Sequence, residues 1–331
     1  MHQECVVVIP FFQRKTGVLA RALASVFAQT YRDFSVIIVD DASPVSVKSE
    51  LALMPAEWMS KIEVIEQENR GPGGARNRAL DAIPNHVPFA AFLDSDDVWM
   101  PEHLERSIAL MKQEDADCSW ETMAPDDDFD PYLPPSDFSQ PALLQPVANV
   151  PGAFKIAKLS RFLMYKWWHF LHLSATVISR DVFTTVRFDE RYRIAVEDFM
   201  FFYACSQIAR SCVISDAIGA KRGTGSNLYH GTQFATPKAV HQLYLSMRAL
   251  AHVQNGPMFD RQDEAALKDW RGETREHAIR NMVSGLRRGH MAILPLAARW
   301  LKEDPKVVVA FLQMMLRLSL QGRGPRPRSQ S

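Results

Sequence analysis

Short apolar runs alternate with amphipathic intervals along the first half of the chain. Four of these runs are rich in β-branched or aromatic residues and have the pattern of buried strands: Cys5–Pro10, Phe34–Val39, Ile62–Ile65 and Val87–Leu93. Apolar residues recur at helical spacing after the first run, at Leu19, Leu23, Val26 and Phe27, and a helical interval precedes each of the last two runs. This rhythm predicts right-handed crossovers and an α/β fold with a mainly parallel sheet flanked by helices.

The second half of the chain changes character several times. Residues Ala124–Pro151 are rich in proline and aspartate, which predicts a loop or lid. Two further strands, His172–Ser179 and Cys212–Ile214, are predicted on either side of a helix over Glu197–Ile208. From about Lys238 onward the pattern is helical, with an apolar face formed by Leu267, Trp270, Ile279, Met282, Val283 and Leu286. We expect a sheet domain over residues 1–235, a helical C-terminal region over 236–321 and a disordered tail over 322–331.

Polar motifs follow three of the predicted strands. Residues Pro10–Arg14 follow the first strand, Asp40–Ser43 the second and Asp94–Asp97 the fourth. Ligands of such sheets bind at the carboxyl ends of the strands, so the three motifs are expected to line one rim. The alternative is that acidic residues after strands are ordinary helix N-caps, which explains a single motif more easily than all three together.

The acidic motif after the fourth strand suggests a metal ion. Carboxylates two residues apart on a turn, such as Asp94 and Asp96, offer hard oxygen ligands to Mg²⁺ or Mn²⁺. Such an ion would balance the local negative charge and would neutralise the charge that builds on a departing diphosphate.

Composition and charge exclude several other classes of protein. The 331 residues carry 38 basic and 38 acidic side chains, which argues against a protein that mainly coats nucleic acid. The four cysteines form no CxxC pair, and we expect reduced thiols in a cytoplasmic protein. The N-terminus lacks the features of a signal peptide, and the late apolar stretch Val307–Leu320 is too short to span a bilayer.

Five fragments occur in the order and approximate spacing of family 2 glycosyltransferases: VVVIPFFQR, SVFAQTYRDFSVIIVDDAS, ENRGPGGARNRAL, AFLDSDDVWMP and FDERYRIAVEDFMFF. The resemblance covers residues 5–230 and implies the Rossmann-like GT-A fold. The opening fragment is most similar to bacterial exopolysaccharide enzymes of the succinoglycan glucosyltransferase type. By resemblance, residues 1–235 would bind a nucleotide sugar and an acceptor. The expected reaction moves a hexose, glucose from UDP-glucose, to a lipid-linked saccharide.

The resemblance also implies residues that bind the nucleotide sugar. Asp41 matches the aspartate that hydrogen-bonds uracil, and Phe12 matches the aromatic residue that stacks on the base. Arg76 matches an arginine near the nucleotide, where its planar cation suits phosphate or a base edge. Asp94 and Asp96 match the metal motif, with Asp96 as the direct ligand. The expected substrate contacts are completed by the neighbouring residues Pro10, Ser95 and Glu197.

By the same resemblance, Asp198 is the general base that takes a proton from the acceptor hydroxyl. One base and one metal ion suffice for a single displacement that inverts the anomeric configuration. The alternative for Glu197-Asp198 is a simple helix cap with favourable dipole interactions.

Two further features have both functional and structural explanations. Trp99 is expected either to face the acceptor sugar or to pack in the core. The stretch Gly71–Gly74 matches neither a dinucleotide fingerprint nor a P-loop, which leaves a nucleotide-facing turn or a tight helix start.

The last 45 residues are strongly basic. Nine basic residues stand against two acidic ones, and Val307–Leu320 is apolar except for Gln313 and Arg317. This segment is expected either to rest on anionic lipid at the inner face of the cell membrane, or to pack on the catalytic domain or a second subunit. Two rival functions stay open at this point: a sugar nucleotidyltransferase, and a catalytically silent scaffold for polysaccharide assembly.

Overall fold

The chain divides into two compact units, Met1–His230 and Gly231–Ser331. The computed structural model describes residues 3–125, 132–223, 232–257, 259 and 261–321. The tail predicted over residues 322–331 lies outside the described residues, as does part of the proline-rich segment, 126–131.

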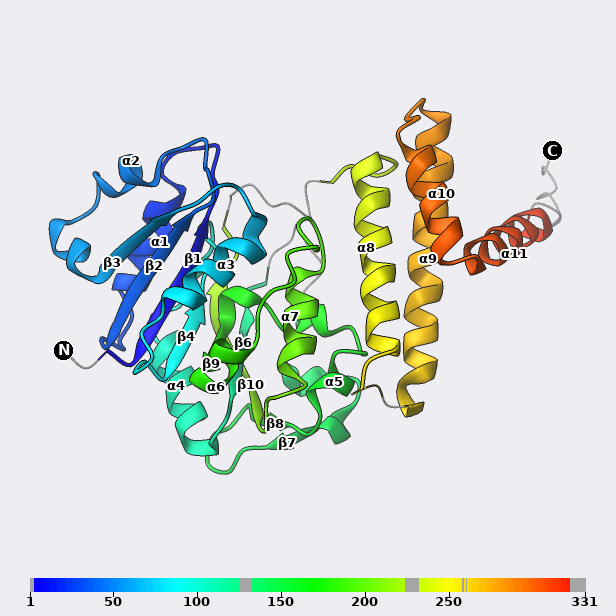
Figure 1. Cartoon of the computed structure of the whole chain (residues 1–331). Coiled ribbons are helices and arrows are strands. Elements are labelled where there is room, and N and C mark those ends of the chain that lie inside the picture. The colour runs from blue at the N-terminus through cyan, green and yellow to red at the C-terminus, as the bar shows by residue number, and fades with distance from the viewer. Residues whose placement is uncertain (1–2, 126–131, 224–231, 258, 260, 322–331) are drawn as a thin grey trace, which may run out of the picture. The chain divides into compact units, whose positions relative to one another are not determined.

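A ten-stranded sheet runs through the described part of the first unit (Figure 1). The spatial order is β3-β2-β1-β4-β9-β6-β10-β8-β7, and β5 pairs with β10. The strands are β1 Cys5–Phe11, β2 Phe34–Asp40, β3 Ile62–Glu66, β4 Phe89–Phe92, β5 Val98–Trp99, β6 Cys118–Met123, β7 Leu144–Pro146, β8 Ala153–Ile156, β9 Thr176–Ser179 and β10 Cys212–Lys221. The predicted α/β class is confirmed, and the first four strands of this order are all parallel.

The register of the parallel strands brings their carboxyl ends together. Phe11 of β1 lies opposite Asp40 of β2, and Val8 of β1 lies opposite Phe92 of β4. The three polar motifs that follow these strands therefore leave the sheet at the same rim, as the sequence pattern predicts.

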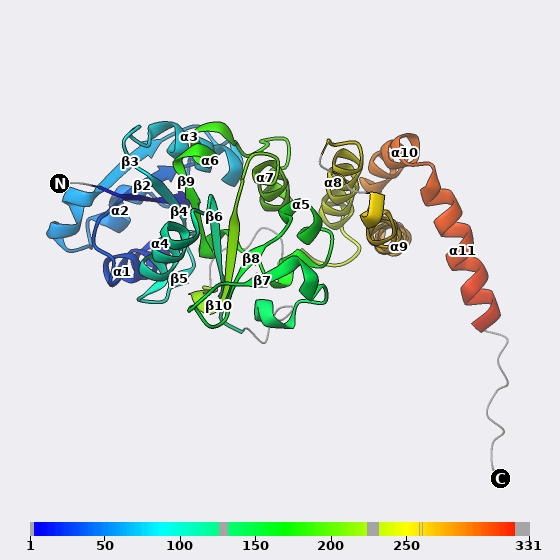
Figure 2. The same cartoon turned by 90° about the horizontal axis from the view of Figure 1, so that it is seen from below.

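Helices cover both faces of this sheet. Figure 2 shows α3 and α6 on one side of the strands and α1 and α4 on the other. Alternate residues of β1, namely Cys5, Val7 and Ile9, belong to the core that includes the apolar faces of α1 and α4. The helices of this unit are α1 Val18–Phe27, α2 Val47–Leu51, α3 Gly71–Ala82, α4 His103–Glu114, α5 Leu159–Phe162, α6 Arg180–Thr185 and α7 Glu197–Cys205.

Packing explains the glycine-rich start of α3. Gly71 has a positive φ of 79°, which favours glycine. A Cβ on Gly73 would lie 3.1 Å from the Cβ of Phe188, and one on Gly74 would lie 2.5 Å from the Cβ of Arg70. These close approaches account for the glycines as a tight helix start.

Two predictions about the middle of the chain need correction. The predicted strand His172–Ser179 begins instead as a 3-10 turn, η5 (Leu173–Ala175), and only Thr176–Ser179 forms β9. The reason is local, because the imidazole of His172 accepts a hydrogen bond from the Ser174 N–H and caps the turn. The segment predicted as a loop or lid contains β7, which pairs antiparallel with β8 and extends the sheet.

The described part of the second unit is helical, with α8 Pro237–Gln254, α9 Glu264–Arg287, α10 Ile293–Glu303 and α11 Lys306–Gln321. Thr236 caps α8 by accepting a hydrogen bond from the Ala239 N–H at 3.2 Å, and Pro237 occupies the first turn. The predicted apolar face of α9 is buried at Leu267 and Ile279. Across the described residues, no helix has both the length and the apolar character that crossing a membrane requires.

Candidate active site

Direct hydrogen bonds join the three polar motifs at the rim. The backbone N–H of Gln13 donates to Ser43 Oγ at 2.8 Å, and Gln13 Nε2 donates to Ser95 Oγ at 3.0 Å. Gln13 and Ser95 are both buried. The prediction that these motifs share one rim is confirmed. Gln13 of the first motif connects it to the other two.

Ser174 holds the acidic turn Asp94–Asp97. Its Oγ accepts a hydrogen bond from the Asp94 N–H at 3.1 Å and donates one to Asp97 Oδ2 at 2.6 Å. The other carboxylate oxygen, Asp97 Oδ1, accepts from the Gly223 N–H at 3.0 Å. A Cβ on Gly223 would overlap the carbonyl oxygen of Asp96, so only glycine fits against this turn. Asp97 is therefore a structural anchor of the turn.

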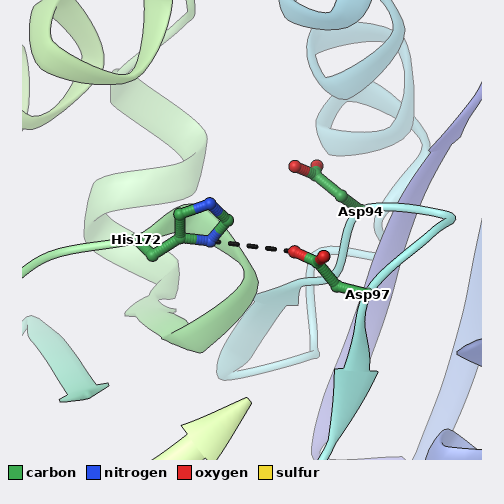
Figure 3. A group of neighbouring side chains, drawn as sticks. All are labelled: Asp94, Asp97 and His172. Carbon is green, nitrogen blue, oxygen red and sulfur yellow. Dashed lines mark ion pairs between the residues drawn. The ribbon is translucent and has the colours of Figure 1, made fainter. Parts of the chain in front are cut away.

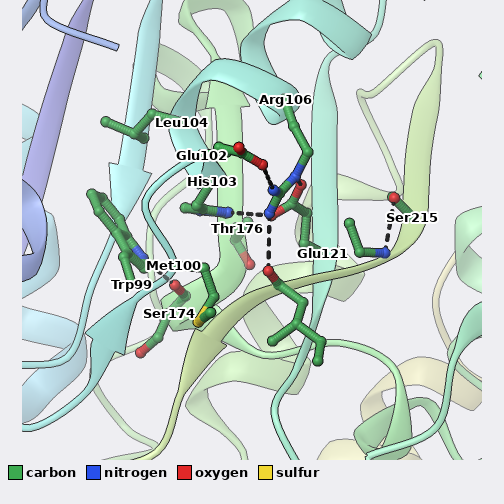
Figure 4. A network of polar contacts seen from close by, with 12 residues as sticks. Trp99, Met100, Glu102, His103, Leu104, Arg106, Glu121, Ser174, Thr176 and Ser215 are labelled. Carbon is green, nitrogen blue, oxygen red and sulfur yellow. Dashed lines mark hydrogen bonds and ion pairs between the residues drawn. The ribbon is translucent and has the colours of Figure 1, made fainter. Parts of the chain in front are cut away.

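Trp99 supports the same turn from the core. Its side chain is only 3% exposed, and its indole N–H donates to the carbonyl oxygen of Ser174 at 2.5 Å (Figure 4). An aromatic face with so little exposure has no surface to offer a sugar. The predicted acceptor contact of Trp99 is therefore replaced by the packing alternative.

Arg76 lies between the acidic turn and the start of α7. Its side chain is 3% exposed, Nη2 donates to Asp94 Oδ1 at 2.5 Å, and Nη1 lies 3.7 Å from Glu197 Oε1. Its guanidinium also lies over the ring of Phe188, 5.3 Å from the centroid. Arg76 Nε and Nη1 are buried without a hydrogen-bond partner in the described part of the chain, which is unusual for buried donors.

The first turn of α7 carries Glu197 and Asp198. Asp198 Oδ1 accepts a hydrogen bond from the N–H of Phe199 at 2.7 Å, and both acidic residues are partly buried. Burial raises the pKa of Asp198, although that backbone hydrogen bond opposes the shift. Burial and the neighbouring Asp198 charge raise the pKa of Glu197 to about 7. A carboxylate with a raised pKa in this position suits proton acceptance.

Negative charge is in excess throughout this site. Five carboxyl groups share two guanidinium groups as counter-charges. The charge of Arg76 acts on Asp94, Glu197 and Asp198. The charge of Arg222 acts on Asp94, Asp96 and Asp97.

The carboxyl groups of the acidic turn differ in how easily they ionise. Burial followed by the Asp97 and Asp94 charges raises the pKa of Asp96 to about 7, and burial and Asp94 do the same for Asp97. Burial would also raise the pKa of Asp94, but the Arg76 guanidinium outweighs it and lowers that pKa. The arrangement favours binding of a cation.

Two sets of side chains at this site could provide ligands for such a cation. Potential ligand atoms of Asp94, Asp97 and His172 lie within 4.8 Å of one another (Figure 3). However, both Asp97 oxygens already accept hydrogen bonds, and His172 Nδ1 accepts the Ser174 N–H at 3.1 Å.

The carboxylate of Asp96 and the second oxygen of Asp94 accept fewer hydrogen bonds than the carboxylate of Asp97. Within the described residues, no other residue donates a hydrogen bond to the Asp96 carboxylate. These oxygens are available to a cation such as Mg²⁺ or Mn²⁺, and Asp94 and Asp96 as its ligands stay a prediction.

The residues expected to contact the base lie at the same rim. Pro10 and Phe12 are partly buried at the end of β1. Asp41 is buried, and its carboxylate accepts hydrogen bonds from the N–H groups of Arg70 and Gly71 at 2.7 and 2.8 Å and from Gln67 Nε2 at 2.7 Å. Asp41 therefore caps α3, and its contact with uracil stays a prediction.

Comparisons with known proteins extend these observations. A family model described as Glycosyl transferase family 2 matches residues 6–186. The succinoglycan biosynthesis protein ExoW of Rhizobium meliloti (strain 1021) is 37% identical over 302 residues, which cover 91% of this chain and 94% of that protein. UDP-Glc:alpha-D-GlcNAc-diphosphoundecaprenol beta-1,3-glucosyltransferase WfgD of Escherichia coli is 31% identical over 106 residues, or 32% of this chain and 40% of that protein.

The fold agrees with a solved structure of low sequence identity. The crystal structure of S. aureus TarS 1-349 in complex with UDP-GlcNAc matches with a TM-score of 0.63 at 18% identity, over 92% of this chain and 82% of that one. The family match spans more than half of the chain, and the Rhizobium relative aligns along nearly all of it. The chain therefore belongs to glycosyltransferase family 2 and is a glycosyltransferase with the GT-A fold.

Proposed function

We propose that this protein is an inverting, metal-dependent hexosyltransferase that moves glucose from UDP-glucose to a lipid-linked saccharide during synthesis of a surface polysaccharide. The observation that carries the proposal is the position of Arg76. One buried guanidinium contacts Asp94 of the acidic turn and lies 3.7 Å from Glu197, the neighbour of Asp198. The turn proposed to bind the metal and the neighbour of the proposed base thus share one counter-charge, which supports the proposal.

The reaction is a single displacement at the anomeric carbon of the hexose. The acceptor hydroxyl oxygen bonds to this carbon, the bond from the carbon to the diphosphate oxygen breaks, and Asp198 takes the hydroxyl proton. Asp94 and Asp96 would hold a Mg²⁺ or Mn²⁺ ion, which supplies Lewis-acid stabilisation of the leaving diphosphate. Arg76 keeps Asp94 ionised and oriented toward that role.

The relatives support the finer parts of the proposal. The Rhizobium relative is named for succinoglycan biosynthesis, and the Escherichia coli relative is named for transfer from UDP-Glc to a saccharide on diphosphoundecaprenol. An acceptor on a lipid carrier would bring the enzyme to the inner face of the membrane. The exposed apolar residues of α11 support such a peripheral location.

Each of the two rival functions would leave at least one acidic residue of the site without a role. A nucleotidyltransferase would attack phosphorus and would leave Asp198 without a role. A silent scaffold would need neither Asp198 nor Asp96. The proposed transfer uses both residues.

The proposal is tested by binding and turnover together. Thermal shifts are measured with UDP-glucose, GDP-mannose and dTDP-glucose, with and without MnCl₂, and we expect a metal-dependent shift specific to the uridine nucleotide. Transfer is followed as radiolabelled glucose appearing on a synthetic polyprenyl-diphosphate saccharide. Asp198→Asn should lower transfer by about 10²–10⁴-fold while nucleotide binding is kept.

A matched control isolates the effect of Asp198. Asp181→Asn makes the same change in the first turn of α6, where the side chain is 72% exposed, and should leave transfer unchanged. Full transfer by Asp198→Asn would refute the assignment of the base. A wild-type protein that binds none of the three nucleotide sugars at saturating Mn²⁺ would refute the function.

A further inference from the structure

His172 is a titratable side chain at this site, and the proposed reaction gives it no role. It directly precedes η5, and its ring faces the carboxylates of Asp94 and Asp97 (Figure 3). The ring of Tyr132 meets it edge-on, with centroids 5.9 Å apart, and the side chain is 21% exposed. The charges of Asp94 and Asp198 both act on it, so it is near the acidic turn and the proposed base.

One backbone hydrogen bond determines where the ring of His172 carries its proton. The N–H of Ser174 donates to His172 Nδ1 at 3.1 Å, so Nδ1 must offer a lone pair. A neutral ring then carries its proton on Nε2. A doubly protonated ring would direct an Nδ1–H at the Ser174 N–H. Burial lowers the pKa of His172 to about 4, which agrees with a neutral ring.

The resulting Nε2–H has no acceptor among the described residues. Within the described part of the chain, the polar contacts of His172 involve Nδ1 or its backbone carbonyl oxygen. Its other contact is the edge-on packing with the ring of Tyr132. The same geometry argues against His172 as a metal ligand, because Nδ1 is occupied and Nε2 is protonated. A neutral donor can bind a ligand oxygen without adding a formal charge beside the cation site.

We propose that the Nε2–H of His172 donates a hydrogen bond to an oxygen of the hexosyl diphosphate of the bound donor. This assignment rests on the proposed function and makes His172 a donor-binding residue. It gives a role to the Nε2–H of a ring that Ser174 contacts at the other nitrogen and Tyr132 contacts edge-on, close to Asp94.

Two substitutions separate ligand binding from local structure. In His172→Asn, the amide oxygen can take the place of Nδ1 and keep the bond from Ser174, whereas the Nε2 donor is lost. In His172→Gln, an amide N–H reaches the place of Nε2, whereas the acceptor for Ser174 is lost. Both variants are compared with the wild type by calorimetric titration with UDP-glucose, UDP and UMP in MnCl₂, and by thermal unfolding without ligand.

We expect His172→Asn to unfold like the wild type and to bind UDP-glucose about tenfold more weakly, the effect of one hydrogen bond to a charged or polar ligand group. UMP keeps the α-phosphate but lacks the β-phosphate and the hexose. Weaker binding of UMP to His172→Asn places the contact on the α-phosphate, whereas equal binding of UMP to all three proteins places it on the β-phosphate or the hexose. His172→Gln should bind UDP-glucose more tightly than His172→Asn. An equal loss for UDP places the contact on the diphosphate, and a loss for UDP-glucose alone places it on the hexose.

Other outcomes overturn the proposal. Wild-type affinity of His172→Asn for UDP-glucose would show that Nε2–H has no role in binding. Parallel loss of binding and of thermal stability in both variants would show that His172 serves packing only. Either result would leave the proposed function standing, since the wild type still binds UDP-glucose, whereas a wild type that binds no nucleotide would overturn both.

Discussion

At the scale of single residues, mutual repulsion among carboxyl groups determines how the site responds to pH. The pKa of Asp96 rises from 3.8 to about 7 on folding, mainly through burial and the charges of Asp97 and Asp94. Between these two values the folded protein binds more protons than the unfolded chain. The contribution of Asp96 to stability is therefore largest at acidic pH and falls as the pH rises toward 7.

This repulsion predicts a pH-dependent effect of a divalent cation. Below about pH 6 a cation must displace protons from Asp96, whereas above about pH 7.5 it meets an ionised carboxylate. The increase in melting temperature caused by MnCl₂ should therefore be small at the lower pH and large at the higher one. Thermal unfolding at both pH values measures it.

Asp96→Asn provides the comparison for this prediction. The variant should be more stable than the wild type at pH 8 without a cation, because one buried negative charge is removed. It should also lose most of the response to Mn²⁺. A cation response of the same size at both pH values would contradict the role given to Asp96.

Residue chemistry alone predicts part of this site. The acidic motif with Asp94 and Asp96 is visible as a pattern in the chain, whereas Arg76 is implied by the family resemblance. The structural role of Asp97 cannot be predicted in this way, because Asp96 and Asp97 have the same side chain. Only the hydrogen bonds from Ser174 and Gly223 distinguish Asp97. His172 lacks any signal of spacing, since its function follows from a backbone N–H two residues later.

At the scale of elements, a buried charge network fixes α4 to the sheet. Glu121 of β6 is 2% exposed and accepts hydrogen bonds from Arg106 Nε at 2.8 Å and Nη2 at 3.0 Å (Figure 4). Its Oε2 also lies 2.8 Å from His103 Nδ1. Arg106 further donates to the carbonyl oxygen of Ile218 at 2.9 Å, which connects α4 with β10.

Removal of Glu121 should therefore destabilise the first unit strongly. Glu121→Ala leaves the buried His103 without its partner and leaves Arg106 paired only with the exposed Glu102, and we expect the free energy of unfolding to fall by about 3 kcal/mol. Urea unfolding followed by tryptophan fluorescence measures this change, because Trp120 adjoins the mutated position.

An exposed partner of the same arginine serves as control. Glu102 accepts from Arg106 Nη1 at 2.7 Å but is 62% exposed, so Glu102→Ala should cost less than about 1 kcal/mol. Similar costs for the two substitutions would show that burial of Glu121 adds nothing to the network.

The same network explains which elements escape prediction. β6 reads CSWETM, in which polar residues alternate with apolar ones, yet all six residues are buried. A pattern analysis places Ser119 and Glu121 at a surface, because it cannot show that α4 covers this strand and supplies His103 and Arg106 as partners of Glu121. Strands β1 to β4 follow the predicted bounds within two residues, and polar residues inside them, such as Ser35 and Glu63, are not buried.

At the scale of the whole molecule, the charge balance is uneven along the chain. The formal net charge is zero, yet the site in the first unit has excess carboxylates and the last 45 residues are basic. Within the second unit, α11 packs on α9 and α10. Its outward residues include Val308, Val309, Leu312, Met315 and Leu316, all exposed and all apolar.

This apolar surface of α11 predicts binding to anionic lipid. Co-sedimentation with vesicles of phosphatidylglycerol and phosphatidylcholine should recover the full-length protein. Changing Leu312 and Leu316 to Glu, at positions 60% and 61% exposed, should weaken the partition by at least about tenfold.

Leu53→Glu is the matched control for this prediction. It makes one leucine-to-glutamate change at a residue that is 78% exposed in the first unit, and it should leave partition unchanged. A wild-type protein that stays in solution with these vesicles but forms oligomers dependent on Leu312 would favour the second-subunit alternative.

The cap on α3 has a consequence for anyone who wishes to redirect this enzyme to another nucleotide. The carboxylate expected to recognise the base also accepts the first N–H groups of the helix that carries Arg76. The predicted contact with the base and the observed contacts with the start of α3 therefore involve the same side chain, so Asp41 is a poor position to change first. The side chain of Phe12 lies at the same rim and cannot cap α3 as the Asp41 carboxylate does, so Phe12 is the better position to change.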